Sequence, residues 1–342
     1  DILPALQARW SPYALDPDRN VAETDLRAIF EAARWAMSSY NEQPWRFIVG
    51  VRGRSEETRE KVLGTIVEGN TPWAKFAPVL ALGLYRPDFA RSGKPNAAAR
   101  HDLGAASACL TVEAAARGIM TTDTTAKVVS RTVGGATLVG IAKGVGMIEP
   151  DMATLLTFVC TDAELDPDTA DTIFRSVVER TFNCLSVDTD TSTSDTAVLL
   201  ANGLAGPVGP EEFEQALFEV MRELTRACAI DGEGAETLIE VNVTGAADFT
   251  QARRVAKLVV NSPLVKTAVH GRDPNWGRVA MAVGKASEDE RISPDHTRIS
   301  FAGFEVYPDR LDAEALALVG KAMDAAEVDI SVDLGVGAAR AT

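Results

Sequence analysis

The stretch Lys143–Ala163, KGVGMIEPDMATLLTFVCTDA, leads from a glycine-rich turn through a proline into an apolar run. Gly144 and Gly146 permit tight backbone turns, and the run TLLTFVC from Thr154 has the composition of a buried strand. A threonine at the head of a strand is held on a rigid element. On residues alone, the ordinary interpretation is that Thr154 simply begins a strand.

The same arrangement permits a particular chemistry if the peptide bond between Ala153 and Thr154 breaks. Thr154 then gains a free α-amine, whose unperturbed pKa of about 7.7–8.0 lies close to cellular pH. Such an amine can accept the proton of the threonine hydroxyl and activate it as a nucleophile. The second interpretation is therefore a threonine nucleophile produced by self-cleavage.

The composition is that of an acidic, globular protein. The chain has 342 residues, 46% of them hydrophobic and 24% charged, with a net charge of −15. This length predicts two domains, and the negative charge argues against nucleic acid as a partner because phosphate backbones repel it. We find no apolar run long enough to span a bilayer and no signal peptide, so we expect a cytoplasmic protein without membrane contact.

Cysteine and histidine residues are few. The cysteines at 109, 160, 184 and 228 form no CxxC pair, and the three histidines show no ligand spacing. We expect the cysteines to be buried, small apolar residues in a reducing compartment. We expect no metal site.

Hydrophobic periodicity predicts alternating helices and strands, and hence an α/β or α+β fold. The composition changes near Gly118, which predicts a first segment over 1–118 and a second over 119–342. In the first segment we expect helices over 21–37, 56–68 and 101–117, and strands over 46–51 and 77–85. In the second we expect strands over 137–142, 154–160, 237–245, 278–284 and 298–307, and helices over 170–185, 209–230, 248–261 and 312–326.

Six blocks follow one another in the second segment. They are MTTDT from 120, AKGVGMIEPDMATLL from 142, DTDTSTSDT from 188, LLANG from 199, IDGEGA from 230 and VNSPLVKTAVHGRDPNWGRVAMAVG from 260. In this order they resemble the glutamate N-acetyltransferase (ornithine acetyltransferase) family over nearly all of 119–342. The fold that this resemblance implies is an α/β domain with an N-terminal-nucleophile-type threonine.

The resemblance implies acetyl transfer from N2-acetylornithine to glutamate through an acetylated threonine, in arginine biosynthesis. Some members also use acetyl-CoA, and none of the chemistry needs a cofactor. Members cut themselves at the bond that corresponds to Ala153–Thr154 and assemble as heterotetramers of the two pieces. Thr154 then matches the nucleophile, and Thr121, Lys143 and Glu233 match positions that contact the substrate.

Elementary chemistry agrees with these roles. A substrate α-carboxylate favours a cation such as Lys143, and an ornithine side-chain amine favours a carboxylate such as Glu233. The alternatives stay open: a lysine after a strand is usually solvated, and a glutamate between glycines usually lies in an exposed turn. Likewise HGRDPNWGR, from His270, is either an anion-binding loop or a polar loop anchored by Trp276.

The first segment carries a second resemblance. ARWAMSSYNEQPWRFIVGV from 33 and RHDLGAASACLTVEAAARGI from 100 are similar to the FMN-dependent nitroreductase family. That family binds the flavin phosphate through an N-terminal arginine and serine and contacts the flavin ring through the SSxNxQPW turn. Carried over, the FMN residues are Arg9, Ser11, Ser38, Ser39, Asn41 and Gln43. The alternative is a polar turn after an amphipathic helix.

Both resemblances are partial. Only Arg9 precedes Ser11 where the family has two arginines, and the nitroreductase match ends near Gly118. The acetyltransferase family has a Thr-Gly pair for the oxyanion upstream of the TTDT block and a final Asn and Thr, for which we find no counterpart here. We therefore expect slow acetyl transfer and weak or no FMN binding. The alternatives are a flavin oxidoreductase with its site in 1–118, or an inactive fusion.

Overall fold

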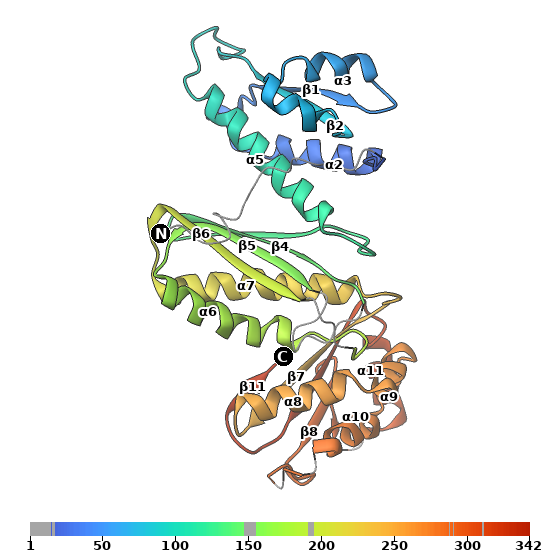
Figure 1. Ribbon diagram of the computed structural model, residues 1–342. Helices are drawn as coiled ribbons and strands as arrows, with labels where there is room; N and C mark the ends of the chain where they lie inside the picture. Colours follow the sequence, from blue (N-terminus) through green and yellow to red (C-terminus); the bar gives the residue numbers. More distant parts are fainter. Residues whose placement is uncertain are drawn as a thin grey trace. The chain divides into compact units, whose positions relative to one another are not determined.

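The computed structural model describes residues 15, 18–146, 155–190, 195–286, 288–289, 291–309 and 311–342. The contacts within the chain divide it into two compact units, Asp1–Ile119 and Met120–Thr342. Both units combine helices with sheets (Figure 1), so the fold belongs to the mixed α/β class, as predicted.

The first unit is built around a two-stranded antiparallel sheet. Strand β1 (Trp45–Val51) pairs with β2 (Val79–Tyr85), so that Ile48 lies opposite Leu82. Among the described residues of this unit, the short helix α4 (Thr71–Ala74) lies just before β2, and five other helical segments precede, connect and follow the strands. The other five are α2 (Glu23–Arg34), η1 (Ser39–Asn41), α3 (Glu56–Leu63), η2 (Glu68–Asn70) and α5 (Ala99–Gly118).

The core of the first unit is small. Helix α2 packs on α5, and α3 packs on β1. At the second contact Gly50 is required, because a Cβ atom there would lie 2.3 Å from the Cα atom of Arg59. The buried hydrophobic cluster consists of Ala33, Ala36, Trp45 and Ala106, with Phe47, Leu103 and Leu110 packed against it.

The second unit begins with a four-stranded sheet in the order β3-β4-β5-β6. Strands β3 (Lys127–Val133), β4 (Ala136–Lys143) and β5 (Leu156–Glu164) are antiparallel neighbours. Helix α6 (Pro167–Arg180) then carries the chain across to β6 (Thr196–Pro207), which runs parallel to β5. Helix α7 (Pro210–Ile230) packs on β3 and β4 and lies beside α6 (Figure 1).

The rest of this unit is a five-stranded sheet in the order β11-β7-β10-β8-β9. Strand β7 (Leu238–Ala246) runs parallel to β10 (Glu327–Asp333) at its centre. Helix α8 (Phe249–Val260) packs on β7 and β11 (Ala339–Ala341), and the core is rich in valine. The remaining elements are α9 (Pro263–His270), α10 (Trp276–Val283), η4 (Gly284–Ala286), β8 (Arg298–Phe301), β9 (Phe304–Tyr307) and α11 (Ala313–Ala322).

Three of the predicted helices begin where their capping residues indicate. The Asp166 side chain accepts a hydrogen bond from the Thr169 N–H at the start of α6, and Asp248 and Asp312 do the same for α8 and α11. Each cap satisfies one of the backbone donors that a helix leaves without an internal partner. The helices predicted over 170–185, 248–261 and 312–326 are therefore present with shifted ends.

The strand predicted over 278–284 is wrong, because this segment belongs to helix α10. The Asn275 side chain accepts a hydrogen bond from the Arg278 N–H and caps the helix. The buried residues Val279, Ala282 and Val283 follow helical spacing rather than alternation. Trp276 packs its ring against Tyr307, with the centroids 4.8 Å apart, which supports the reading of HGRDPNWGR as an anchored polar loop.

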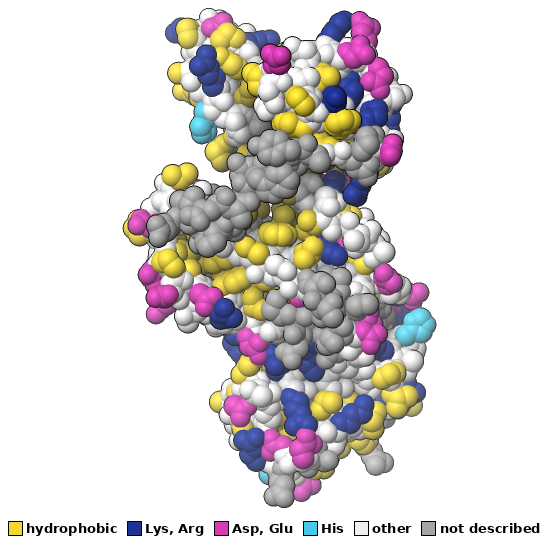
Figure 2. Space-filling model, in the orientation of Figure 1, with side chains coloured by type: hydrophobic (Ala, Val, Ile, Leu, Met, Phe, Trp, Pro, Cys, Tyr) yellow, Lys and Arg dark blue, Asp and Glu magenta, His cyan; other side chains and the backbone are white. Residues whose placement is uncertain are grey.

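The burial of the cysteines differs from the expectation. Cys228 is buried, Cys109 and Cys184 are partly buried, and Cys160 on β5 is exposed. The alternation of β5 places Cys160 on the face opposite to the buried Val159. On the face shown in Figure 2, acidic and basic side chains are intermixed. Of the helices that the structure describes, none has the length and apolar character to cross a bilayer.

Gly140 lets α7 approach β4, since a Cβ atom there would lie 2.7 Å from side-chain atoms of both Val220 and Leu224. Replacing Gly140 with valine should overpack this contact and lower the free energy of unfolding by about 1–3 kcal/mol, as measured by denaturant titration. Gly284→Ala is the control, because no atom lies within 4 Å of its added Cβ. Equal effects of the two changes would contradict the close-packing argument.

Candidate active site

A buried ion network lies at the centre of the site. The Lys127 ammonium, at the start of β3, is 2.7 Å from an Asp123 carboxylate oxygen and 2.7 Å from an Asp231 oxygen. The exposed fractions of these side chains are 1% for Lys127, 0% for Asp123 and 6% for Asp231. Two carboxylates and one ammonium are thus held away from water at hydrogen-bond distance.

The network keeps all three groups charged. Burial alone would raise the pKa of Asp123, but hydrogen bonds from Lys127 and from the N–H groups of Gly144 and Thr121 outweigh it and lower that pKa. Burial would likewise lower the pKa of Lys127, but the bonds to Asp123 and Asp231 raise it instead. The cluster therefore carries one net negative charge.

The carboxylates of this network also hold backbone from two turns. Asp123 accepts hydrogen bonds from the N–H of Thr121 at 3.2 Å and from the N–H of Gly144 at 2.8 Å. Asp231 accepts one from the Thr124 N–H at 2.9 Å and another from the Thr124 hydroxyl. The TTDT turn (Thr121–Thr124) is thereby fixed to the end of β4 and to the end of α7.

Lys143 is the last residue of β4, and only 5% of its surface is exposed. Its ammonium donates a hydrogen bond of 3.4 Å to the Thr121 hydroxyl. The solvated lysine considered from the sequence is therefore not what the structure shows. A buried cation beside a hydroxyl is suited to bind a carboxylate.

Glu233 lies in the GEG turn (Gly232–Gly234), and its N–H donates to the Val145 carbonyl at 2.8 Å. A Cβ atom at Gly146 would lie 3.2 Å from the Glu233 carboxylate, so the carboxylate lies against the backbone that follows Lys143. Glu233 is nevertheless exposed, as the ordinary interpretation expected. The structure thus brings the predicted residues Thr121, Lys143 and Glu233 to one region.

Ala153 and Thr154 lie outside the described residues, in the gap over 147–154. The described residues on both sides of that gap belong to the site. Gly146 lies against Glu233, and the N–H of Leu155 donates to the carboxylate of Asp195.

Asp195 is a site residue that the sequence reading missed, although it ends the DTSTSD run. Burial raises its pKa to about 6, against the opposing effects of the hydrogen bond from Leu155 and the charge of Lys143. Its second carboxylate oxygen is buried and has no hydrogen-bond partner in the described part of the chain. Asp123, Lys127 and Asp231 were also missed, and the four-residue spacing of Asp123 and Lys127 was the available signal.

Four of the predicted FMN residues, Ser38, Ser39, Asn41 and Gln43, lie in a strained turn of the first unit. The Ser38 hydroxyl accepts from the Gln43 N–H at 3.0 Å, and the Gln43 amide donates to the Arg34 carbonyl at 2.8 Å. The Ser39 N–H donates to the buried Asp102 at 3.2 Å, and Asn41 has a φ of 53°. These hydrogen bonds attach a polar turn to helices α2 and α5, which agrees with the alternative interpretation. Arg9 and Ser11 lie outside the described residues.

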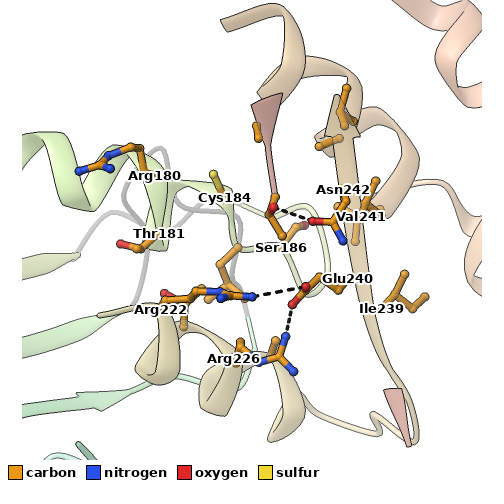
Figure 3. Close-up of a pocket in the computed structure, with 18 of the residues that line it drawn as sticks. Arg180, Thr181, Cys184, Ser186, Arg222, Arg226, Ile239, Glu240, Val241 and Asn242 are labelled. Atoms are coloured by element: carbon orange, nitrogen blue, oxygen red, sulfur yellow. Dashed lines mark hydrogen bonds and ion pairs between the residues drawn. The ribbon is translucent and has the colours of Figure 1, made fainter. Parts of the chain in front are cut away.

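Two adjoining cavities lie in the second unit. The larger, about 520 Å³, is lined by α7, β7 and the segment after α6, and Figure 3 shows Arg222 and Arg226 directed at Glu240. There Arg226 pairs with Glu240 and Glu327, and Arg222 lies 3.5 Å from Glu240. The smaller, about 340 Å³, is lined by the GEG turn, Lys266 and His270. Glu233 thus borders a cavity, whereas Thr121 and Lys143 line neither of the two.

Titratable side chains do not gather in a metal-binding pattern within the described ranges: no three His, Cys, Asp or Glu residues there could hold an ion together. Asp123, Lys127 and Asp231 are instead paired with each other and with backbone, and Lys143 is bonded to the Thr121 hydroxyl. The site combines a buried Lys127 ammonium flanked by two carboxylates with a second buried ammonium, that of Lys143, beside the Thr121 hydroxyl.

Comparison with known proteins gives two family matches. The ArgJ family matches residues 91–342, and the nitroreductase family matches residues 6–82. Glutamate N-acetyltransferase Oat2 of Streptomyces clavuligerus is 61% identical over 227 residues, which are 65% of this chain and 58% of that protein. Arginine biosynthesis bifunctional protein ArgJ 2 of Nostoc sp. is 58% identical over 228 residues, 67% of this chain and 59% of that protein.

The crystal structure of an arginine biosynthesis bifunctional protein ArgJ from Bacillus halodurans is also similar. It is 37% identical, with a TM-score of 0.50, and the match covers 54% of this chain and 90% of that chain. The present chain spans less than two thirds of the length of the two relatives above, 58% and 59%.

The raised pKa of Asp195, about 6, predicts a pH-dependent stability. The folded protein holds this proton up to about that pH, whereas the unfolded chain releases it near pH 4. The carboxyl therefore becomes less favourable to folding as the pH rises from about 4 to above 6. Asp195→Asn keeps an oxygen for the Leu155 N–H but cannot ionise, so its stability relative to the wild type should increase over this range.

Denaturant titration of both proteins at several pH values between 4 and 8 measures this difference. A stability difference that stays constant across the range would show that Asp195 is not desolvated in the folded protein.

Proposed function

The chain belongs to the ArgJ family, and on this premise we propose that it transfers the acetyl group of N2-acetylornithine to glutamate, a step of arginine biosynthesis. We assign this activity to an acetyltransferase domain over 119–342. Residues 1–118, with their nitroreductase-family segment over 6–82, form a separate domain in this proposal.

One observation carries the proposal: the residues assigned from the sequence meet at the start of the segment that contains Ala153 and Thr154, and Asp195 lies at its end. Lys143 donates to Thr121 before the segment, and Glu233 contacts the same backbone at Gly146. Beyond the segment, Leu155 is bound by Asp195. Charged groups that could hold an amino-acid substrate therefore lie beside the described residues that precede and follow the segment 147–154.

The proposed reaction has two halves. Cleavage between residues 153 and 154 frees the α-amine of Thr154, which takes the proton of the hydroxyl as its oxygen attacks the acetyl carbonyl. The tetrahedral intermediate breaks its bond to nitrogen, and the departing ornithine amine receives the proton. The amine of glutamate then attacks the acetyl-threonine ester, which forms N-acetylglutamate and returns the hydroxyl of Thr154.

The described side chains fit the charges of this substrate. Lys143 is shielded from water, so its attraction for the substrate α-carboxylate is weakly screened. The Thr121 hydroxyl, already 3.4 Å from that ammonium, can bind the same carboxylate. Glu233 borders the smaller cavity and can pair with the ammonium of the ornithine side chain. Each contact is charge-assisted, which gives strong and directional hydrogen bonds.

The remaining parts of the proposal follow the family. The acetyl transfer needs no cofactor, and acetyl-CoA is a second candidate donor. The cleaved chains assemble as an oligomer in the cytoplasm, and neither nucleic acid nor membrane takes part.

We predict that Thr154→Ala leaves the chain intact, because it removes the hydroxyl that attacks the Ala153–Thr154 bond. Thr154→Ser, which keeps a hydroxyl, is the matched control and should still cut. The intact mass of each purified protein, with gel electrophoresis under denaturing conditions, measures the result. Cleavage of the alanine variant at the same bond would rule out Thr154 as the nucleophile.

A second candidate function, flavin-dependent oxidoreduction, is favoured only by the nitroreductase-family match over 6–82. The described residues fit FMN poorly. The Gln43 amide already donates to the Arg34 carbonyl, and the Ser38 hydroxyl accepts from the Gln43 backbone.

We predict that the purified protein keeps little or no FMN, since the turn that would contact the flavin ring is held by internal hydrogen bonds. The absorbance near 450 nm after gel filtration of protein incubated with excess FMN measures retention. One flavin retained per chain would contradict this prediction and support the oxidoreductase.

A further inference from the structure

The ionic cluster of Asp123, Lys127 and Asp231 binds the TTDT turn and the residue after Lys143, and it is almost inaccessible to solvent. Its two ion pairs are 2.7 Å long, and none of its side chains is more than 6% exposed. Such a cluster is an inefficient way to stabilise a fold, because desolvation offsets most of the attraction between buried charges. A hydrophobic cluster of the same volume would serve stability as well, so the position of these charges calls for another explanation.

Each carboxylate of the cluster binds backbone that leads directly to a predicted site residue. Asp123 binds the N–H of Thr121 and the N–H of Gly144, the residue after Lys143. Asp231 binds Thr124 at the other end of the TTDT turn and stands two residues before Glu233. The three segments come from before β3, after β4 and after α7. They are joined by this cluster, by the hydrogen bond between Lys143 and Thr121, and by the hydrogen bond from the Glu233 N–H to the Val145 carbonyl.

We propose that Asp123, Lys127 and Asp231 are positioning residues that set the spacing of Thr121, Lys143 and Glu233 for the substrate. The proposal rests on the proposed function for its substrate. It concerns residues that touch no substrate themselves and act through the backbone they hold.

The charge balance of the cluster suggests which substitution to make. Lys127→Met would leave two buried carboxylates without a cation to balance their charge, a change that destabilises proteins strongly. Asp123→Ala removes the acceptor of Thr121 and Gly144 but leaves Lys127 paired with Asp231 at 2.7 Å. This variant should therefore fold while it releases the two backbone donors.

Two matched variants accompany it. Asp123→Asn retains an oxygen that can accept from Gly144, so it should restore part of the lost function. Asp171→Ala removes a carboxylate from an exposed ion pair with Arg175, whose side chains are 60% and 78% exposed, and should change nothing.

The first measurement is amide hydrogen exchange of the full-length chain. In Asp123→Ala the amides of Thr121 and Gly144 should exchange at least about tenfold faster, as expected for loss of a hydrogen bond to a charged group. The amides of β10, in the other sheet, should keep their wild-type rates. Unchanged exchange at Thr121 and Gly144 would overturn the proposal.

The second measurement is steady-state acetyl transfer from N2-acetylornithine to glutamate. We expect kcat/KM of Asp123→Ala to fall by about tenfold or more, mainly through a higher KM for N2-acetylornithine, because Thr121 and Lys143 lose their spacing. A purely structural role would reduce the amount of folded enzyme, and hence the apparent kcat, and would leave KM unchanged. That outcome, or full activity, would overturn the proposal.

The two measurements separate this proposal from the proposed function. If the wild-type chain shows no Thr154-dependent transfer, the proposed function fails, while the exchange rates still report whether the cluster holds the two turns. If Asp123→Ala does not fold, Asp231→Ala replaces it, since that variant leaves Lys127 paired with Asp123. Its expected result is faster exchange at Thr124 and in the GEG turn, and unchanged exchange there would overturn the proposal.

Discussion

The Lys127 ammonium is shielded from water, and this burial determines which groups can lie beside it. A buried ammonium is tolerated where carboxylates pair with it and accept its hydrogen bonds, and here two carboxylates do so. The pair carries more negative charge than one lysine can balance. The N–H groups of Thr121, Thr124 and Gly144 donate hydrogen bonds to the carboxylates and stabilise the remaining negative charge. The geometry of two turns is thus fixed by electrostatic neutralisation.

The first unit is organised by a different constraint. Its fully buried cluster contains three alanines and one tryptophan, so helix packing contributes little apolar area. Its turn after α2 places Tyr40, Asn41 and Gln43 at positive φ, a conformation that costs energy for residues other than glycine. Hydrogen bonds from this turn to Asp102 and Arg34 offset that cost. The polar groups of the turn therefore stabilise the conformation of the turn itself.

Much of the fold could be predicted from local signals, and the errors have physical causes. Apolar spacing and aspartate caps locate α6, α8 and α11. The segment RVAMAVG is apolar after its first residue, so composition did not distinguish strand from helix. In the structure Asn275 caps a helix there. Strand β6 was not predicted, although LLANG lies within it, because its partner β5 is separated from it by the whole of α6.

The site was predictable only in part. Sequence blocks assigned Thr121, Lys143 and Glu233 to the candidate site, but the burial of Lys143 beside Thr121, 22 positions away, was not predicted. The hydrogen bonds of Asp195 and Asp231 could not be predicted from local sequence, because their partners Leu155 and Thr124 are 40 and 107 positions away. The gap over 147–154 contains Thr154, whose role stays a prediction.

The antiparallel ladder between β4 and β5 has a topological consequence. Six residue pairs, from Leu138 opposite Thr161 to Lys143 opposite Leu156, join the strands on either side of residues 153 and 154. Strand β5 also lies between β4 and β6 in the sheet. After a break at that bond, β4 and β5 would belong to different polypeptides yet share a single sheet. The two pieces would behave as one particle in native buffer and come apart only when the sheet unfolds.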